Sequence, residues 1–164
     1  MTAFAVLAAG CGNAAPGGVA SVGSSPTSSV TSTIETEAVV DTGDLVDPEI
    51  RTVTVDGQEY LVAFADDPAT RSQGLMAVED IGDLDGMLFD LQVERQATFT
   101  MRNTLIPLDI VFFAADGTGR AMLRMVPCVA EPCPTYPSGA AARYALEVPA
   151  DSGNLTADSI LAVP

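Results

Sequence analysis

The chain has 164 residues, of which 22 are acidic and 7 basic, so its net charge is -15. All seven basic residues are arginine and histidine is absent. This composition excludes Schiff-base and P-loop lysines, histidine-based catalysis and the common histidine metal sites. The acidity argues against a nucleic-acid partner, because phosphate binding requires clustered basic side chains, while 48% hydrophobic residues suffice for the core of one domain.

The N-terminus begins with a short apolar segment. Residues 3–9 are too few to span a bilayer, which takes about 20 residues, and are typical of the end of a secretory signal peptide. The next run, L-A-A-G-C at residues 7–11, resembles a bacterial lipobox, in which the cysteine is diacylated and becomes the mature N-terminus. We therefore expect residues 1–11 to end a signal peptide whose start codon is placed too far downstream, with a lipid on Cys11. The alternative is a plain apolar N-terminus with an incidental cysteine.

Residues 12–50 differ in composition from the rest of the chain. Gly, Ser, Thr, Pro and Ala dominate, and the segment has six acidic residues and no basic one. Such a segment buries too little apolar surface to offset its ordering entropy. We predict a disordered acidic tether, spanning roughly 35 Å as a flexible coil.

The folded domain is expected at residues 51–164 and begins with a hairpin. Two β-rich runs, 52–55 and 60–64, flank the dipeptide Asp56-Gly57, which is a strong hairpin signal. Asp67 is a plausible N-cap with Pro68 at the first helical position, and Gly74 fits the helix end. The pattern predicts one short helix near residues 68–75.

Short strands separated by turns follow. We predict strands at 87–89, 97–101, 108–114, 120–126, 143–148 and 159–163, and loops at 79–86, 91–96 and 127–139. Residues 108–114 do not alternate, so both faces of that strand should be covered. Residues 143–148 alternate, with Arg143 and Glu147 on the polar face. Many short strands and one small helix predict an all-β protein, a compact β-sandwich or barrel.

Five motifs occur in order in the domain: R-x-x-G-L-M (71–76), G-M-L-F (86–89), F-x-M-x-N-T-x-x-P-L-D (99–109), C-x-x-x-x-C-x-x-Y (128–136) and Y-x-L-E (144–147). Together they resemble the DUF192 family of bacterial and archaeal proteins over about residues 53–163. The resemblance implies a compact, jelly-roll-like β domain with a small helix, often exported. It implies no function, since the family is named as one of unknown function.

Polar residues around Pro107 form the sharpest candidate site. Asp109 precedes an apolar strand, and a desolvated carboxylate there needs a cation or hydrogen-bond donors. Asn103 and Thr104 could donate, and Arg71 or Arg102 could supply the charge. The alternative is that Asn103 and Asp109 only brace the turn, as Asx residues commonly do. The candidate ligand-binding residues are Arg71, Met101, Asn103, Thr104, Asp109 and Tyr136.

Two further groups of residues could form a disulfide or bind a metal ion. Cys128 and Cys133 should form a structural disulfide in an exported protein, worth about 2 kcal/mol in the loop-entropy model for a six-residue ring. Asp80, Asp83 and Asp85 have the side chains of a calcium loop but not the EF-hand spacing. We expect neither a metal nor a cofactor.

These features favour a non-catalytic binding module for a small or saccharide ligand. It would be monomeric, extracytoplasmic and anchored to the bacterial cell membrane through the lipid on Cys11. One alternative is a structural or partner-binding envelope protein. Another is a hydrolase that uses Asp109 and Glu147 as a pair of carboxylates, which for glycosidic chemistry must lie about 5–10 Å apart.

Overall fold

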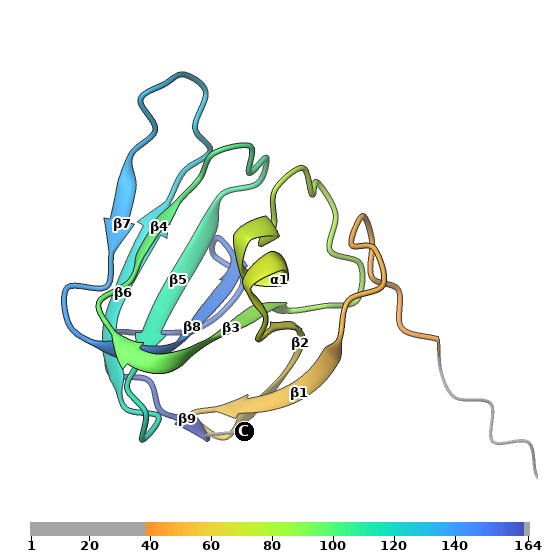
Figure 1. Cartoon of the computed structure of the whole chain (residues 1–164). Coiled ribbons are helices and arrows are strands. Elements are labelled where there is room, and N and C mark those ends of the chain that lie inside the picture. Colours follow the sequence, from red (N-terminus) through yellow and green to blue (C-terminus); the bar gives the residue numbers. More distant parts are fainter. Residues whose placement is uncertain (1–38, 163–164) are drawn as a thin grey trace, which may run out of the picture. The chain divides into compact units, whose positions relative to one another are not determined.

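The structure, a computed structural model, describes residues 39–162, which are mostly β with a single short helix in that range (Figure 1). The elements are β1 (Ile50–Val55), β2 (Gln58–Ala65), α1 (Pro68–Gln73), β3 (Gly86–Arg95), β4 (Thr98–Thr100), β5 (Leu108–Phe113), β6 (Gly119–Met125), β7 (Thr135–Pro137), β8 (Ala142–Pro149) and β9 (Leu161–Ala162). The prediction of an all-β fold with one short helix is confirmed. Residues 1–38, with the predicted signal peptide and most of the tether, lie outside the described range.

Helix α1 forms where the capping signals predict it. The Asp67 carboxylate accepts hydrogen bonds from the backbone N–H groups of Ala69 and Thr70, at 2.7 and 3.2 Å, and Pro68 is the first helical residue. Gly74 ends the helix with φ of 48°, a conformation that few residues other than glycine adopt. No helix within residues 39–162 combines the length and apolar character required to cross a bilayer.

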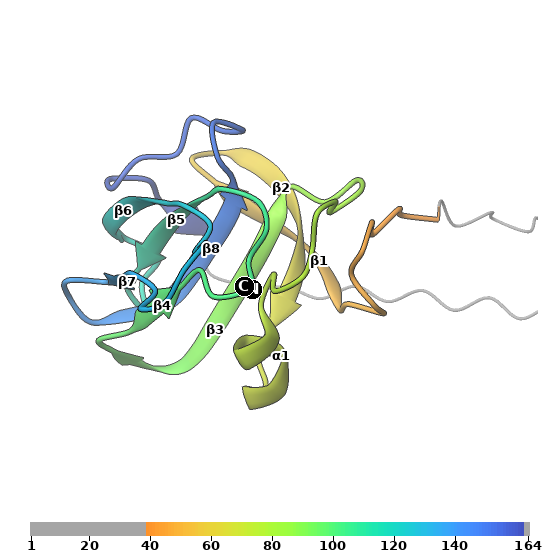
Figure 2. The same ribbon diagram turned by 90° about the horizontal axis from the view of Figure 1, so that it is seen from above.

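Seven strands form one sheet in the order β6-β5-β8-β3-β2-β1-β9. Neighbouring strands are antiparallel except β2 and β3, which are parallel. Two parallel strands cannot be joined by a tight turn and need a crossover connection. Helix α1 and the loop to residue 85 form this crossover, so the helix lies beside β2 and β3 (Figure 2).

The sheet curls until its two edges meet. The N–H of Gly119, at the start of β6, donates to the carbonyl of Ser159 at 2.9 Å, and the N–H of Leu161 in β9 donates to the carbonyl of Gly117 at 2.9 Å. Side chains that point into the curl form one buried cluster. It includes Val53, Val62, Leu88, Val111, Leu146 and Leu161.

The outer face of the sheet carries a second apolar cluster. It is covered by the crossover loop that follows α1 and by a two-stranded ribbon of β4 and β7. Because both faces are covered, all six residues of β5 are buried, as its lack of alternation predicts. Members of the outer cluster include Leu75, Phe89, Met101, Ile110, Phe112 and Ala145.

Strand β3 is longer than predicted. The expected loop at 91–96 is wrong, because β3 continues to Arg95, which pairs with Ala142 of β8. The pairing shifts between Asp90 and Arg95, and Gln92 lies there with φ of 67°. This bulge interrupts the strand pattern without ending the strand, and it redirects the last residues of β3.

The predicted boundary of the tether at residue 50 is also wrong. Residues 39–49 pack against the domain, with Val40 and Leu45 partly buried on the outer cluster. The Asp44 carboxylate accepts the backbone N–H groups of Glu79 and Asp80, at 2.9 and 3.0 Å. Two apolar side chains and a carboxylate with amide partners are enough to fix a segment whose composition otherwise favours disorder.

Candidate functional site

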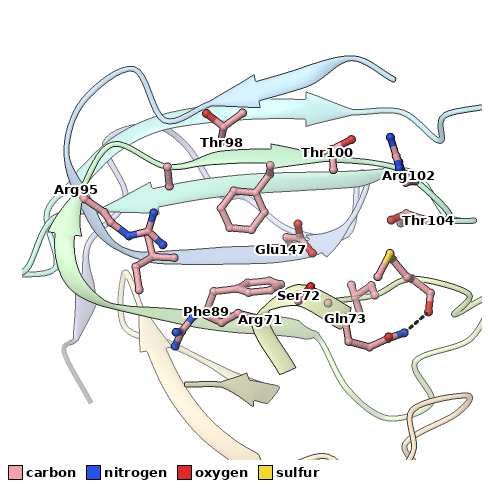
Figure 3. Close-up of a pocket in the computed structure, with 16 residues that line it drawn as sticks. Arg71, Ser72, Gln73, Phe89, Arg95, Thr98, Thr100, Arg102, Thr104 and Glu147 are labelled. Carbon is pink, nitrogen blue, oxygen red and sulfur yellow. Dashed lines mark hydrogen bonds between the residues drawn. The ribbon is translucent and has the colours of Figure 1, made fainter. Parts of the chain in front are cut away.

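A cavity of about 320 Å³ opens on the outer face of the sheet, lined by residues of β3, β4, β8 and α1 (Figure 3). Its size falls within the range of small-molecule sites, about 300–1,000 Å³. Its apolar walls include Leu75, Phe89, Leu91 and Phe99, and its polar lining includes Ser72, Gln73, Thr98, Thr100 and Thr104. Its charged residues are Arg71, Arg95, Arg102 and Glu147.

Strand β8 brings Glu147 into this cavity. Its alternation puts Leu146 and Val148 inside the curl, so Glu147 points to the outer face. Its neighbours across the strands are Met87 and Ile110, both apolar. Gly86 lets β3 approach β8 here, because a Cβ at that position would lie 2.0 Å from the Glu147 carbonyl oxygen.

The Glu147 carboxyl has no protein partner in the described part of the chain. The residue is only 5% exposed, and burial raises the pKa of Glu147 to about 8. An unpaired buried carboxylate is costly, so the group retains its proton instead. A neutral carboxyl presents one O–H donor and one carbonyl acceptor to the cavity. Glu147 is therefore a hydrogen-bonding group that a ligand can satisfy.

Two aromatic rings give the cavity a defined apolar wall. Phe89 of β3 and Phe99 of β4 meet edge to face, with ring centroids 5.2 Å apart. Phe99 also contacts Phe112 of β5, at 5.6 Å and in the same edge-on manner. Edge-to-face pairs add roughly 0.5–1.5 kcal/mol beyond their area burial. The ribbon strand β4 is thereby held against the sheet, and the wall is preformed.

The structure divides the predicted ligand-binding residues. Arg71 and Thr104 line the cavity. Met101 is buried in the outer cluster and Tyr136 packs against it from β7, while neither lines the cavity. Asn103 occupies a turn with φ of 56°, and its carbonyl accepts the N–H of Ala77 at 2.8 Å. Asn103 does not line the cavity, and this contact is made by its backbone.

Asp109 belongs to a different cluster. Its carboxylate pairs with Arg124 directly across the β5–β6 hairpin, with Nη2 to Oδ2 at 3.1 Å, and it accepts the N–H of Asp151 at 3.2 Å. Arg124 also pairs with Asp151 at 2.7 Å. The hydrogen bonds that Arg124 donates to Asp109 and then to Asp151 raise the pKa of Arg124 above its usual range. The expected partners Arg71 and Arg102 are wrong, and Asp109 joins three segments.

The register of β5 and β8 also separates the two carboxylates proposed for hydrolysis. Asp109 pairs with Val148, and Ile110 pairs with Glu147. Directly paired residues share a face and successive residues alternate, so Asp109 and Glu147 lie on opposite faces of the sheet. They cannot flank one glycosidic bond.

The remaining predicted groups are structural. The disulfide Cys128–Cys133 is present, as predicted. Asp80, Asp83 and Asp85 do not converge on a common point: each accepts a backbone N–H at 2.7 to 3.0 Å. Among the residues described, no three metal-ligating side chains gather into a possible ion site.

A second cleft, of about 550 Å³, lies on the other side of Gln73, Gly74 and Met76. Its lining is acidic, with five carboxylates and no basic residue. Several of these carboxylates already have partners: Asp44 holds the crossover loop and Asp67 caps α1. The Glu147 cavity is thus the better candidate site, because its carboxyl has no protein partner within residues 39–162.

Glu147 and Arg95 are two charged lining residues that the predicted ligand-binding set does not include. The alternation in residues 143–148 suggests that Glu147 faces solvent. The bulge at Gln92 interrupts the strand pattern, so the sequence does not show that β3 continues to Arg95. One signal in the sequence could have indicated that Glu147 is buried. Residues 108–114 are expected to be covered on both faces, so the neighbouring strands of the sheet should be covered as well. A carboxylate on such a strand is unusual.

Comparisons with known proteins agree on the fold and assign no activity. The model of the family DUF192, described as "Uncharacterized ACR", matches residues 51–156. A Sinorhizobium meliloti protein described as a "putative transcription regulator" is 32% identical, with a TM-score of 0.61, 71% of this chain covered and 95% of that chain. A protein of unknown function from Novosphingobium aromaticivorans is 28% identical, with a TM-score of 0.62, 76% of this chain covered and 92% of that chain. No curated protein matches.

Proposed function

Because the chain belongs to the DUF192 family, whose description names no activity, we propose from the cavity itself that the domain is a non-catalytic binding module for a small organic ligand. One observation carries the proposal: Glu147 is buried at the cavity with no protein partner for its carboxyl. Buried polar groups are almost always hydrogen-bonded. A ligand that bonds to this carboxyl supplies the missing partner and gains a preformed aromatic wall.

Binding is favoured over hydrolysis by the residues that line the cavity. Glu147 is the one acidic residue among them, and Asp109 lies on the opposite face of the sheet. Two-carboxylate chemistry needs both groups at one bond. The lining otherwise consists of arginines, hydroxyl and amide side chains, and apolar groups, which bind and orient a ligand rather than activate it.

We place the module outside the cytoplasm, anchored to the membrane by a lipid on Cys11. The lipobox-like run at residues 7–11 supports this placement. So does the disulfide Cys128–Cys133, because disulfides persist mainly in oxidising compartments. Replacing Cys11 with serine should move the protein from the membrane fraction to the soluble fraction. Membrane association that survives this change would refute the anchor.

The description of the Sinorhizobium meliloti relative as a regulator of transcription is not carried over to this chain. A net charge of -15 repels the phosphate backbone. Several of the 7 basic residues pair with carboxylates, among them Arg51, Arg124 and Arg143.

A thermal-shift screen of the full chain tests the proposal, with small organic acids, amides, amines and cell-wall saccharides as ligands. A ligand that binds the native state raises Tm. Thr100→Trp places an indole at the cavity lining, on a residue that is exposed, and should abolish every such rise. Thr52→Trp, on exposed β1 surface away from the cavity, is the matched control and should keep them. Rises that persist in Thr100→Trp would refute the site.

A further inference from the structure

The cavity concentrates positive charge in a strongly acidic protein. Three of the chain's seven arginines, Arg71, Arg95 and Arg102, line it, against one acidic residue, Glu147. The neighbouring cleft shows the opposite pattern, with acidic residues alone among its charged lining. A cavity that is locally positive on a chain of net charge -15 is suited to an anion, because arginines at its lining attract an opposite charge that comes within a few ångströms.

Two of the three arginines are engaged by the protein. Arg71 donates through Nη1 to the backbone carbonyls of Asp66 and Asp90, the latter at 3.0 Å. Arg102 pairs with Glu131, with Nη2 to Oε1 at 2.9 Å. Both guanidinium groups keep their positive charge, but their positions are fixed by these contacts.

Arg95 differs, since within residues 39–162 its guanidinium has no ion pair or hydrogen bond. The bulge at Gln92 redirects the end of β3, and the pairing of Arg95 with Ala142 then fixes its backbone. Its side chain extends from the end of β3 into the space in front of the sheet, on the side from which Glu147 is reached (Figure 3). The cavity therefore holds one unpaired guanidinium and one unpaired carboxyl, in addition to its aromatic wall.

We propose that the ligand is a small molecule with an apolar, ring-sized body and a single carboxylate, which bonds to the Arg95 guanidinium and to the carboxyl O–H of Glu147. This inference rests on the cavity being the ligand site, as proposed above. Arginine pairs with carboxylates through parallel N–H···O bonds, and a protonated carboxyl donates to the second oxygen. An apolar cavity of about 150 Å³ already accommodates benzene, so 320 Å³ leaves room for a substituted ring.

The protonation of Glu147 makes this binding dependent on pH. The charged groups around the cavity are Arg95 from β3, Arg71 from α1 and Arg102 from the segment after β4, while β5 presents the apolar Ile110 beside Glu147. Because burial raises the pKa of Glu147 to about 8, the donor is present at neutral pH. Above that pH the group becomes a second anion and repels the ligand carboxylate. A cationic ligand would instead meet three arginines around a neutral acid.

Calorimetric titration of the full chain with three matched probes tests this inference. Benzoate, benzamide and benzylammonium share one ring and differ in charge. At pH 6.5 benzoate should bind, and benzamide and benzylammonium should bind at least tenfold more weakly. At pH 9 about one tenth of Glu147 keeps its proton, so the Kd of benzoate should rise about tenfold.

Variants assign the two contacts. Arg95→Gln should weaken benzoate at least tenfold, whereas Arg120→Gln, an equal charge change outside the cavity lining, should not. Glu147→Gln retains an N–H donor and should bind benzoate with the same affinity at pH 6.5 and pH 9.

Three results would overturn the inference. Tighter binding of benzylammonium than of benzoate would leave the cavity as a binding site and refute the carboxylate. Unchanged benzoate affinity in Arg95→Gln would refute the arginine contact. The absence of saturable benzoate binding would refute the ligand class, while the broader thermal-shift screen decides separately whether the cavity binds a ligand at all.

Discussion

Replacing Glu147 with glutamine should change how the stability of the protein depends on pH. The folded-state pKa of about 8 stands against an ordinary value of 4.5. Below pH 4.5 the carboxyl is protonated in both the folded and the unfolded chain. Between pH 4.5 and about 8 the unfolded chain releases this proton and the folded one retains it, so the free energy of unfolding falls as pH rises.

The size of the effect follows from the same two values. At 1.36 kcal/mol for each pKa unit, the loss of stability between pH 4.5 and pH 8 is about 5 kcal/mol. Glutamine has nearly the same shape and does not titrate. Glu147→Gln should therefore match the native protein at pH 4 and exceed its free energy of unfolding by up to about 5 kcal/mol at pH 9.

Urea unfolding of the full chain at pH values from 4 to 9 measures this difference. Glu59→Gln, on the exposed part of β2, is the control for removing one carboxylate from an acidic protein, and its curve should run parallel to that of the native chain. Parallel curves for Glu147→Gln as well would mean that Glu147 ionises as freely in the folded state as in the unfolded one, which would contradict its raised pKa.

Four other variants test the parts of the fold that surround the site. Arg124→Ala leaves the buried Asp109 without its cation and should lower the urea midpoint of unfolding. Asp109→Asn should lower it less, because Arg124 is half exposed and keeps Asp151 as its second partner. Neither change should alter ligand binding at neutral pH, which calorimetry will show. Replacing Cys128 and Cys133 with serine should cost about 2 kcal/mol in the loop-entropy model, measured as a lower urea midpoint, and an unchanged midpoint would contradict it. Gly86→Ala should destabilise by about 3 kcal/mol or more, because its Cβ would meet a β8 carbonyl at 2.0 Å, and circular dichroism melting will detect this.

Local signals in the sequence predicted the local structure well. The Asp56-Gly57 turn lies between β1 and β2, and the cap formed by Asp67 and Pro68 starts α1. Each of these features depends on residues that are adjacent in the chain, so composition and spacing are sufficient. The disulfide Cys128–Cys133 was predictable for the same reason.

The candidate site was less predictable because it depends on long-range contacts. Alternation in β8 indicates two unlike faces, but it does not say that the crossover loop and a ribbon cover the polar one. The partner of Asp109 could have been found in part from the sequence. Counting outward from a turn at Asp116-Gly117 places Arg124 opposite Asp109, and this is the pairing in the structure. The bulge at Gln92 that redirects Arg95 has no such signal, since φ of 67° at a glutamine is not foreseeable from its type.

The packing of residues 39–49 shows the same limit of composition. The segment is rich in acidic and small residues, which favours disorder, yet Asp44 accepts two backbone N–H groups of the crossover loop. Those amides belong to a loop about 35 residues further along the chain. Local composition does not indicate contacts with residues that are so far along the chain.

A ¹³C NMR titration of the Glu147 carboxyl, with and without saturating benzoate, tests the buried acid and its role in ligand binding most directly. We expect a titration midpoint near 8 in the free protein. Because benzoate is expected to bind the protonated form, the ligand should move this midpoint upward. A midpoint near 4.5 would contradict the buried, unpaired carboxyl, and a midpoint that benzoate leaves unchanged would contradict its role in holding the ligand.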